Sequence, residues 1–221
     1  MAEKYGTIPK RFTSEWWEYF WMYYKVHTIV VILVLFAIVF TVYQVCTQPK
    51  YDLNIAYVSS LLFDETIENE LREDVIGKIE DIDENGEKSI YFEHLIFSED
   101  STESEYTSAV ITKLNLGYIT DDILLYVFSE EKGKYLFGDD SLDGLFGSAS
   151  DWLNDGVEID DDKLYKVGDK AYGVKISSTV LADMPGNDLY VAVRNLRPGA
   201  DEKAVKRFAE SKKIANYLIK Q

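Results

Sequence analysis

Serine residues follow most of the strands that the sequence predicts, at the points where α/β proteins often bind ligands. The residues concerned are Ser59, Ser60, Ser98, Ser129, Ser177, Ser178 and Thr179. In open α/β sheets, ligands bind beyond the carboxyl ends of the strands and near helix N-termini. Hydroxyl and backbone N–H groups there could hold a small polar ligand, and the acidic neighbours favour a neutral or cationic one. The alternative is that the serines only cap helices, because serine is a favoured N-cap residue.

The segment Asp81-Ile82-Asp83-Glu84-Asn85-Gly86 matches the opening of a calcium-binding loop, D-x-D-x-N-G. In such loops, oxygen atoms at alternate positions surround a hard cation, and Asp81, Asp83 and Asn85 would supply them here. The twelfth position, which should carry a bidentate glutamate, is Phe92. Two interpretations follow: a polar turn that needs no cofactor, or a site for extracellular Ca²⁺ at millimolar concentration.

Residues that could form a catalytic site are sparse after residue 50. His94 is the one histidine there and lies in the middle of a predicted strand, and the only cysteine, Cys46, precedes this region. A Ser-His-Asp triad would need its histidine at a loop or strand end. Neither a Walker loop nor an H-E-x-x-H motif is present. We therefore expect no enzymatic activity.

A long uncharged segment precedes these residues and predicts a membrane anchor. The 24 positions from Val26 to Pro49 carry no charge, and about 20 apolar residues suffice to cross a hydrocarbon layer of about 30 Å as a helix. Four basic residues precede the segment and only Lys50 follows it closely, so the positive-inside rule puts the N-terminus in the cytoplasm. The sequence thus predicts a cytoplasmic tail with an aromatic interfacial helix (1–25), a single-pass transmembrane helix (26–47), a linker (48–50) and an extracellular domain (51–221).

The segment from Ser14 to Lys25, SEWWEYFWMYYK, is unusually rich in aromatic residues. Ser14 is the expected N-cap of this helix. One interpretation is an entry helix at the level of the lipid headgroups. The other is a contact surface for a membrane-protein partner, because Trp and Tyr are common anchors of interfaces. The residues that would make this contact are Trp16, Trp17, Phe20, Trp21 and Tyr24.

The charge of the chain is strongly negative and unevenly distributed. The formal net charge is −16, of which the first 25 residues contribute +1 and the last 21 contribute +3, so the remainder carries −20. Such a field repels nucleic acid and anionic lipid, and we expect no nucleic-acid binding. It favours cations, cationic ligands or basic partners, unless it serves only solubility.

Hydrophobic periodicity predicts one α/β domain after the anchor. We expect strands over 52–58, 90–97, 123–128 and 189–193, a hairpin over 164–176 that turns at Gly168-Asp169, and helices over 64–79 and 102–116, with Gly117 ending the second. A last helix begins at the Asp201 cap. Strands that alternate with helices imply a three-layer domain with a mainly parallel sheet and helices on both faces.

Several segments resemble those of a known class of proteins. They are YKVHTIVVILVLFAIVFTVYQ at the anchor, DLNIAYVSS in the first strand, and DILLYVFSEEKGKYLFG, LDGLF and KAYGVKISST further on. On these segments the chain resembles membrane-anchored extracellular proteins of anaerobic Gram-positive bacteria, whose outer part is similar to one lobe of a type 2 periplasmic solute-binding protein. The chain returns after Ile176 through only one strand and one helix. We therefore expect a single lobe, without a second lobe to close over a ligand.

Two functions are compatible with these features. The first is a non-enzymatic, membrane-tethered accessory subunit whose outer domain contacts a partner protein of a membrane complex such as a transporter. The alternative is an extracytoplasmic sensor or solute-binding domain for a small neutral or cationic ligand. The aromatic helix and the missing second lobe favour the first, and the serines at the strand ends favour the second.

Overall fold

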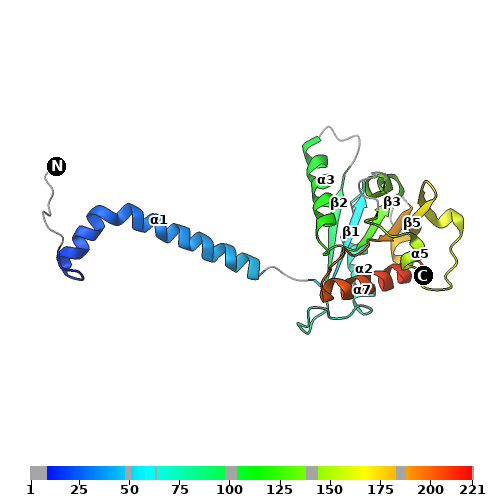
Figure 1. Cartoon of the computed structure of the whole chain (residues 1–221). Helices are drawn as coiled ribbons and strands as arrows, with labels where there is room; N and C mark the ends of the chain where they lie inside the picture. Colours follow the sequence, from blue (N-terminus) through cyan, green and yellow to red (C-terminus); the bar gives the residue numbers. More distant parts are fainter. Residues whose placement is uncertain are drawn as a thin grey trace. The chain divides into compact units, whose positions relative to one another are not determined.

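The computed structural model describes residues 9–47, 51–62, 64–97, 104–137, 144–182 and 188–220. The chain divides into two compact units, Met1–Lys50 and Tyr51–Gln221. The first contains one helix, and the second is a mixed α/β domain (Figure 1).

The first unit is a single long helix, α1 (Ser14–Cys46), which bends within its first third (Figure 1). Its N-cap is Thr13, whose hydroxyl accepts the Trp16 N–H at 3.2 Å, so the expectation that Ser14 caps the helix is wrong. The large apolar side chains from Val26 to Tyr43 are each at least 50% exposed. By length and composition, α1 can span a membrane.

The centre of the second unit is a six-stranded sheet of order β2-β1-β3-β6-β5-β4. Its strands are β1 (Leu53–Ser59), β2 (Ile90–Ile96), β3 (Leu125–Ser129), β4 (Leu164–Val167), β5 (Lys170–Lys175) and β6 (Leu189–Val193). Strands β2, β1 and β3 are parallel to one another. The pairs β3–β6, β6–β5 and β5–β4 are antiparallel.

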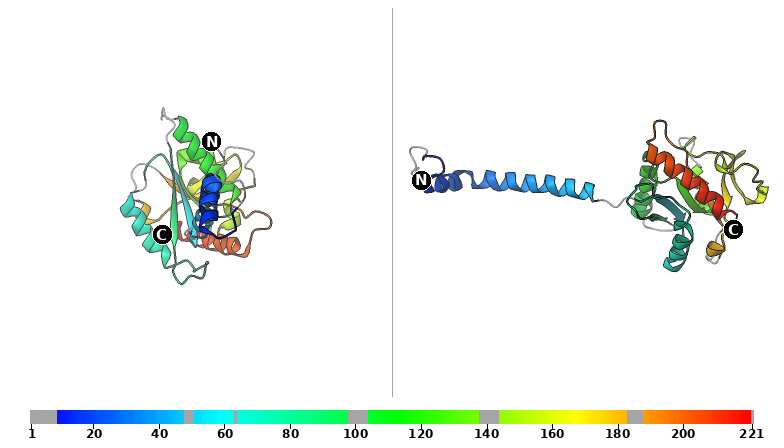
Figure 2. Two further views of the ribbon diagram at one scale, coloured as in Figure 1. Left: turned by 90° about the vertical axis from the view of Figure 1, so that its left-hand side faces the viewer. Right: turned by 90° about the horizontal axis from the view of Figure 1, so that it is seen from below.

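Helices cover both faces of this sheet. On one face, α2 (Glu65–Ile76) and α7 (Glu202–Leu218) pack with α5 (Ala149–Trp152) on a core that includes Leu71, Trp152 and Leu218. On the other face, α3 (Ser104–Ile119) and α4 (Gly133–Phe137) pack on a second core that includes Val110 and Phe137. The Tyr217 hydroxyl donates to Asp74 and joins α7 to α2, which lie together in Figure 2. Among the described residues, the short remaining helices are η1 (Glu130–Lys132), η3 (Asp161–Lys163) and α6 (Thr179–Ala182).

The structure confirms the mixed α/β class and the hairpin, which turns at Gly168 with a φ of +61°. Four of the six strands, β1, β2, β3 and β5, run in one direction, but three of the five neighbouring pairs are antiparallel. The reason is that β6 returns directly beside β5, whereas a parallel neighbour would need a crossover past the sheet. The prediction that Gly117 ends the second helix is wrong, because α3 continues to Ile119.

Candidate functional site

Of the serines predicted to bind a ligand, those that the structure describes lie along one edge of the sheet, at the carboxyl ends of strands. Ser59 ends β1 and Ser129 ends β3, and the two strands are neighbours through the Val58–Phe128 pair. Ser177 lies further along the same edge. Ser129 pairs with Leu189 of β6. The Leu189 carbonyl in turn accepts the N–H of Ile176, which follows β5 and directly precedes Ser177.

Most of these serines face inward rather than into solvent. Ser59, Ser129 and Ser178 are 1%, 0% and 2% exposed, whereas Ser177 is exposed and Ser60 is partly exposed. Ser98 lies outside the described residues, and so does the side chain of Thr179, which begins α6. A ligand at this edge would therefore reach Ser60 and Ser177 directly but not the buried hydroxyls.

The alternative, that the serines cap helices, finds no capping bond at Ser59 or at Ser129. The N-cap of α2 is Asp64, which accepts the Thr66 N–H at 2.8 Å, while the Ser59 hydroxyl accepts the Leu61 N–H in a local turn. Ser129 occupies the N-cap position of η1 but makes no capping bond, and its buried hydroxyl has no partner among the described residues.

A buried lysine, Lys132, lies close to this edge, and the sequence analysis did not identify it. Its side chain is 2% exposed, and its ammonium group lies 4.7 Å from the centre of the Phe97 ring and 5.7 Å from that of Tyr135. Glu131 lies 3.5 Å from the ammonium group. The cation–π contacts partly replace the water that the ammonium group gives up. Local sequence could not reveal this burial, since lysine is normally exposed.

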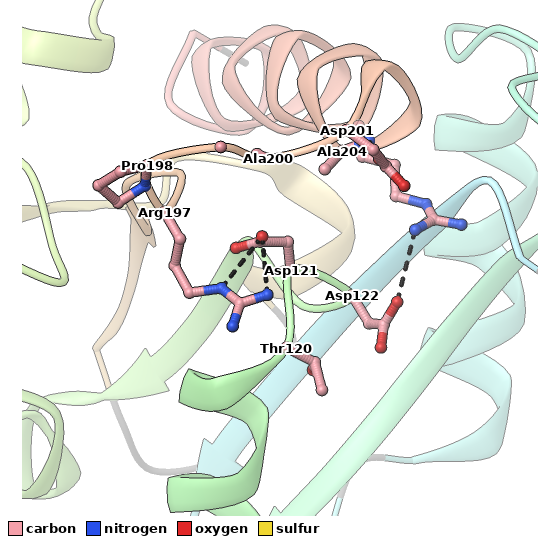
Figure 3. Close-up of a pocket in the computed structure, with 10 residues that line it drawn as sticks. Thr120, Asp121, Asp122, Arg197, Pro198, Ala200, Asp201 and Ala204 are labelled. Carbon is pink, nitrogen blue, oxygen red and sulfur yellow. Dashed lines mark hydrogen bonds and ion pairs between the residues drawn. The ribbon is translucent and has the colours of Figure 1, made fainter.

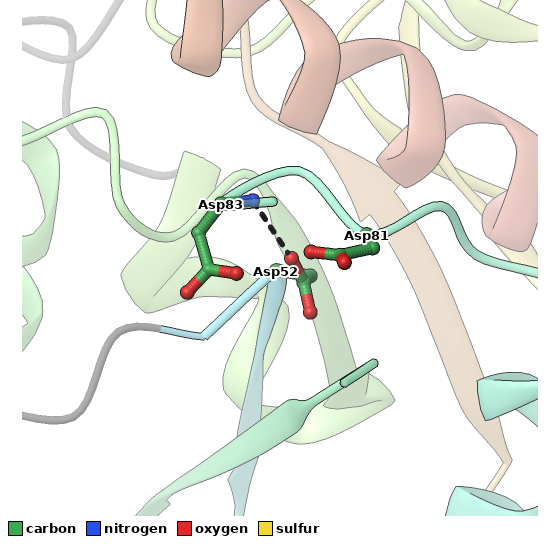
Figure 4. A group of neighbouring side chains, drawn as sticks. All are labelled: Asp52, Asp81 and Asp83. Carbon is green, nitrogen blue, oxygen red and sulfur yellow. Dashed lines mark hydrogen bonds between the residues drawn. The ribbon is translucent and has the colours of Figure 1, made fainter. Parts of the chain in front are cut away.

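The acidic turn brings together three carboxylates, of which the sequence predicted two. Asp81 and Asp83 lie beside Asp52, which immediately precedes β1 and is fully buried (Figure 4). One oxygen atom of each lies within 4.8 Å of the others. Asn85, the third predicted ligand, instead donates its amide to Asp83 at 2.9 Å and accepts the Glu87 N–H.

Backbone donors already occupy most of these carboxylate oxygens. Asp52 accepts the N–H groups of Ile82 at 2.6 Å, Asp83 at 3.2 Å and Ser89 at 2.8 Å. Asp81 accepts the N–H of Gly86 at 2.8 Å, and this bond is the main reason why the pKa of Asp81 is lowered. Hydrogen bonds to the ionised form stabilise it. The arrangement explains the D-x-D-x-N-G pattern as a turn held by its own carboxylates, and the calcium interpretation stays a prediction.

A cavity of about 810 Å³ opens at the other end of β3, between the segment before that strand and the first turn of α7 (Figure 3). The charged residues among those that line it are Asp121, Asp122, Arg197, Asp201 and Arg207. Its size lies within the usual range of small-molecule sites, about 300–1,000 Å³. The sequence analysis missed this cavity because its two walls are more than 70 residues apart in the chain.

Asp121 is the most strongly paired group of the cavity. Its carboxylate accepts bonds from Arg194 at 2.6 Å and from the Nε and Nη2 atoms of Arg197 at 3.1 Å. Burial acts to raise the pKa of Asp121, but the Arg197 hydrogen bonds and the charges of both arginines outweigh it, so that the pKa is lowered. Arg194 is fully buried and also donates to the Thr120 carbonyl. The ion pair between Arg194 and Asp121 therefore holds this wall of the cavity in place.

Five aromatic residues near the start of α1 form a partly exposed collar, defined here as Trp16, Trp17, Phe20, Trp21 and Tyr24. Trp16, Phe20 and Tyr24 are stacked on one another at i, i+4 spacing, with ring centres 5.4 and 5.7 Å apart. Trp17, Trp21 and Tyr24 are 49%, 50% and 46% exposed. At about 100° per residue, the five side chains cover an arc of about 140° on the helix.

No known protein-family model, curated protein or solved structure matches this chain. The resemblance to a solute-binding lobe therefore stays a prediction.

Proposed function

We propose that this protein is a non-enzymatic, membrane-tethered accessory subunit, with its α/β domain outside the cytoplasm and its contacts made to a partner of a membrane complex such as a transporter. The observation that carries the proposal is the aromatic collar. Its rings are stacked along α1, and those of Trp17, Trp21 and Tyr24 are exposed within the described chain.

The length of α1 supports this proposal. Its 33 residues extend about 50 Å at 1.5 Å per residue, whereas the hydrocarbon layer is about 30 Å thick and needs about 20 residues. The surplus corresponds to the first turns, which carry the collar. A single helix needs only a few interfacial aromatic residues, so five large rings on one arc suit a protein contact in addition to lipid.

The collar can be tested by affinity purification of the tagged full-length chain from its native membranes in mild detergent. The wild-type protein should recover a partner in stoichiometric amount. The double variant Trp17→Ala/Trp21→Ala should reduce the recovery by about tenfold or more, because truncating an interface hot spot costs at least about 2 kcal/mol. Met22→Ala is the matched control, since Met22 is similarly exposed at 46% but lies on the other side of α1.

Two results would contradict the proposal. One is that the wild-type protein elutes as a monodisperse monomer with no partner. The other is that the double variant retains the partner as well as Met22→Ala does, which would leave the collar as a lipid-facing element only.

A second candidate function is a tethered receptor for a small ligand. The observation that favours it is the cavity lined by Asp121, Asp122, Arg197 and Arg207, which is large enough for a small molecule and presents both signs of charge. Thermal-shift measurements of the full-length chain in detergent with panels of cations, sugars and amino acids would test it. A raised unfolding temperature with one class supports the receptor, and no change with any class argues against it.

A further inference from the structure

The charged groups of the cavity differ in how far their hydrogen-bonding capacity is used. Asp121 is saturated by Arg194 and Arg197, as described above. Asp201 accepts the Ala204 N–H at 2.7 Å through one carboxylate oxygen and thereby caps α7. The pair held most weakly is Arg207 with Asp122, whose one contact is 3.5 Å long.

The guanidinium group of Arg207 is mostly buried but has few hydrogen-bond acceptors among the described residues. Its side chain is 15% exposed, and its Nη1 atom lies 3.5 Å from Asp122, at the limit of a hydrogen bond. Its Nε atom is buried and has no acceptor among the described residues. Guanidinium groups present a planar set of donors that matches a carboxylate, so the weakly paired Nη1 side of this group suits an anionic partner in the cavity.

Asp122 offers the opposite charge a few ångströms away. Its side chain is 60% exposed, and its carboxylate lies 3.5 Å from Arg207. Figure 3 shows Asp122 beside Asp121 on the wall that faces the first turn of α7. The positive end of the α7 dipole adds to the field at Arg207. An anionic and a cationic group of one ligand can thus be bound side by side.

We propose that the cavity binds a small zwitterion of the amino-acid type. Its carboxylate pairs with Arg207 and its ammonium group pairs with Asp122, replacing their weak mutual contact by two close ones. The inference rests on the second function proposed above, the small-ligand receptor, and names its ligand class. A net-neutral ligand also suits a domain whose strong negative charge repels simple anions.

The experiment measures the unfolding temperature and the affinity of the full-length chain in detergent with glycine, L-alanine and L-glutamine at millimolar concentration. Acetate and methylammonium serve as one-sided probes. We expect at least one zwitterion to stabilise the domain, and neither one-sided probe to do so at the same concentration. Arg207→Gln should weaken the binding about 10- to 100-fold, the usual effect of losing a charged hydrogen-bonded pair.

Two further variants test the second ligand contact and control for changes on the same helix. Asp122→Asn should weaken zwitterion binding and, like the wild type, show no stabilisation by acetate. Lys203→Gln, an exposed position on the same helix that does not line the cavity, should bind like the wild type. Equal binding by Arg207→Gln and wild type would overturn the proposed site. Stabilisation by sugars or metal ions alone would overturn the ligand class but keep the receptor, and no stabilisation by any probe would overturn both.

Discussion

Replacing Asp52 by alanine is expected to destabilise the α/β domain strongly, because this buried carboxylate holds the acidic turn to the start of β1. It accepts four donors, the N–H groups of Ile82, Asp83 and Ser89 and the hydroxyl of Ser89. The two shortest bonds, 2.6 Å from Ile82 and 2.8 Å from Ser89, are each worth about 1.5–3 kcal/mol as bonds to a charged group.

The other two donors, the Asp83 N–H and the Ser89 hydroxyl, lie 3.2 Å from the Asp52 carboxylate. They belong to partly exposed residues, so water can accept their hydrogen bonds after the substitution. The expected loss is therefore about 3–6 kcal/mol, a large part of the 5–15 kcal/mol that holds a typical domain together. Asp52→Asn should lose less, about 2–3 kcal/mol, because its amide keeps one acceptor but turns a donor toward Ser89.

Pulse proteolysis in urea is the suitable assay, since cleavage reports the unfolded domain while α1 stays in the detergent micelle. Asp83→Ala is the matched control: Asp83 belongs to the same turn, but its bonds to Asn85 are exposed, and its loss should cost below about 1 kcal/mol. Millimolar calcium should leave the urea midpoint of the wild type unchanged, because backbone donors occupy Asp52. The reasoning is refuted if Asp52→Ala unfolds at the wild-type urea concentration, or if Asp83→Ala is as costly.

Two further predictions concern the cavity wall and the packing of glycines. The pKa of Asp121 is lowered below its ordinary 3.8 by Arg197 and Arg194. Their pairing with Asp121 therefore stabilises the domain above about pH 4, and this stability is lost as the pH falls through the lowered pKa. Arg194→Met should cost about 3–5 kcal/mol at neutral pH in urea titrations, and an unchanged urea midpoint would contradict the buried pair. Gly133→Ala should destabilise the domain by about 1–3 kcal/mol, since the added Cβ would lie 2.2 Å from the Tyr165 ring. Gly77→Ala has open space instead and should be neutral or slightly stabilising in the same titrations, so similar losses for both glycine variants would count against the packing argument.

The strands and main helices could be predicted from the sequence because their apolar patterns are local. The strand expected over 52–58 is β1 (Leu53–Ser59), and the one over 189–193 is β6 itself. The end of α3 could not be read in the same way. Gly117 is compatible with a helix that continues, and a Cβ there would only touch Tyr126 and Ile123 at 3.6 and 3.7 Å. Glycine lowers helix stability, but tertiary packing overrides this preference.

The groups that matter at the candidate sites were harder to foresee because their partners are distant in the chain. Asp52 bonds to a turn 30 residues away, and Arg194 to Asp121 over 73 residues. Lys132 is buried by an aromatic ring that follows β2. A charged residue in a sequence gives no signal of burial until the fold supplies its partner. Only the serine positions, which directly follow apolar strands, could be placed at one edge in advance.

The most direct test of the central claim, an anchor formed by α1 with the α/β domain outside, is cysteine labelling in intact cells. In a Cys46→Ser background, Lys203→Cys and Lys10→Cys introduce single exposed thiols on the two sides of α1. A membrane-impermeant maleimide should label Lys203→Cys in intact cells, and Lys10→Cys only after the cells are permeabilised. Labelling in the opposite order would invert the orientation, and equal labelling of both variants only after lysis would contradict the extracellular domain altogether.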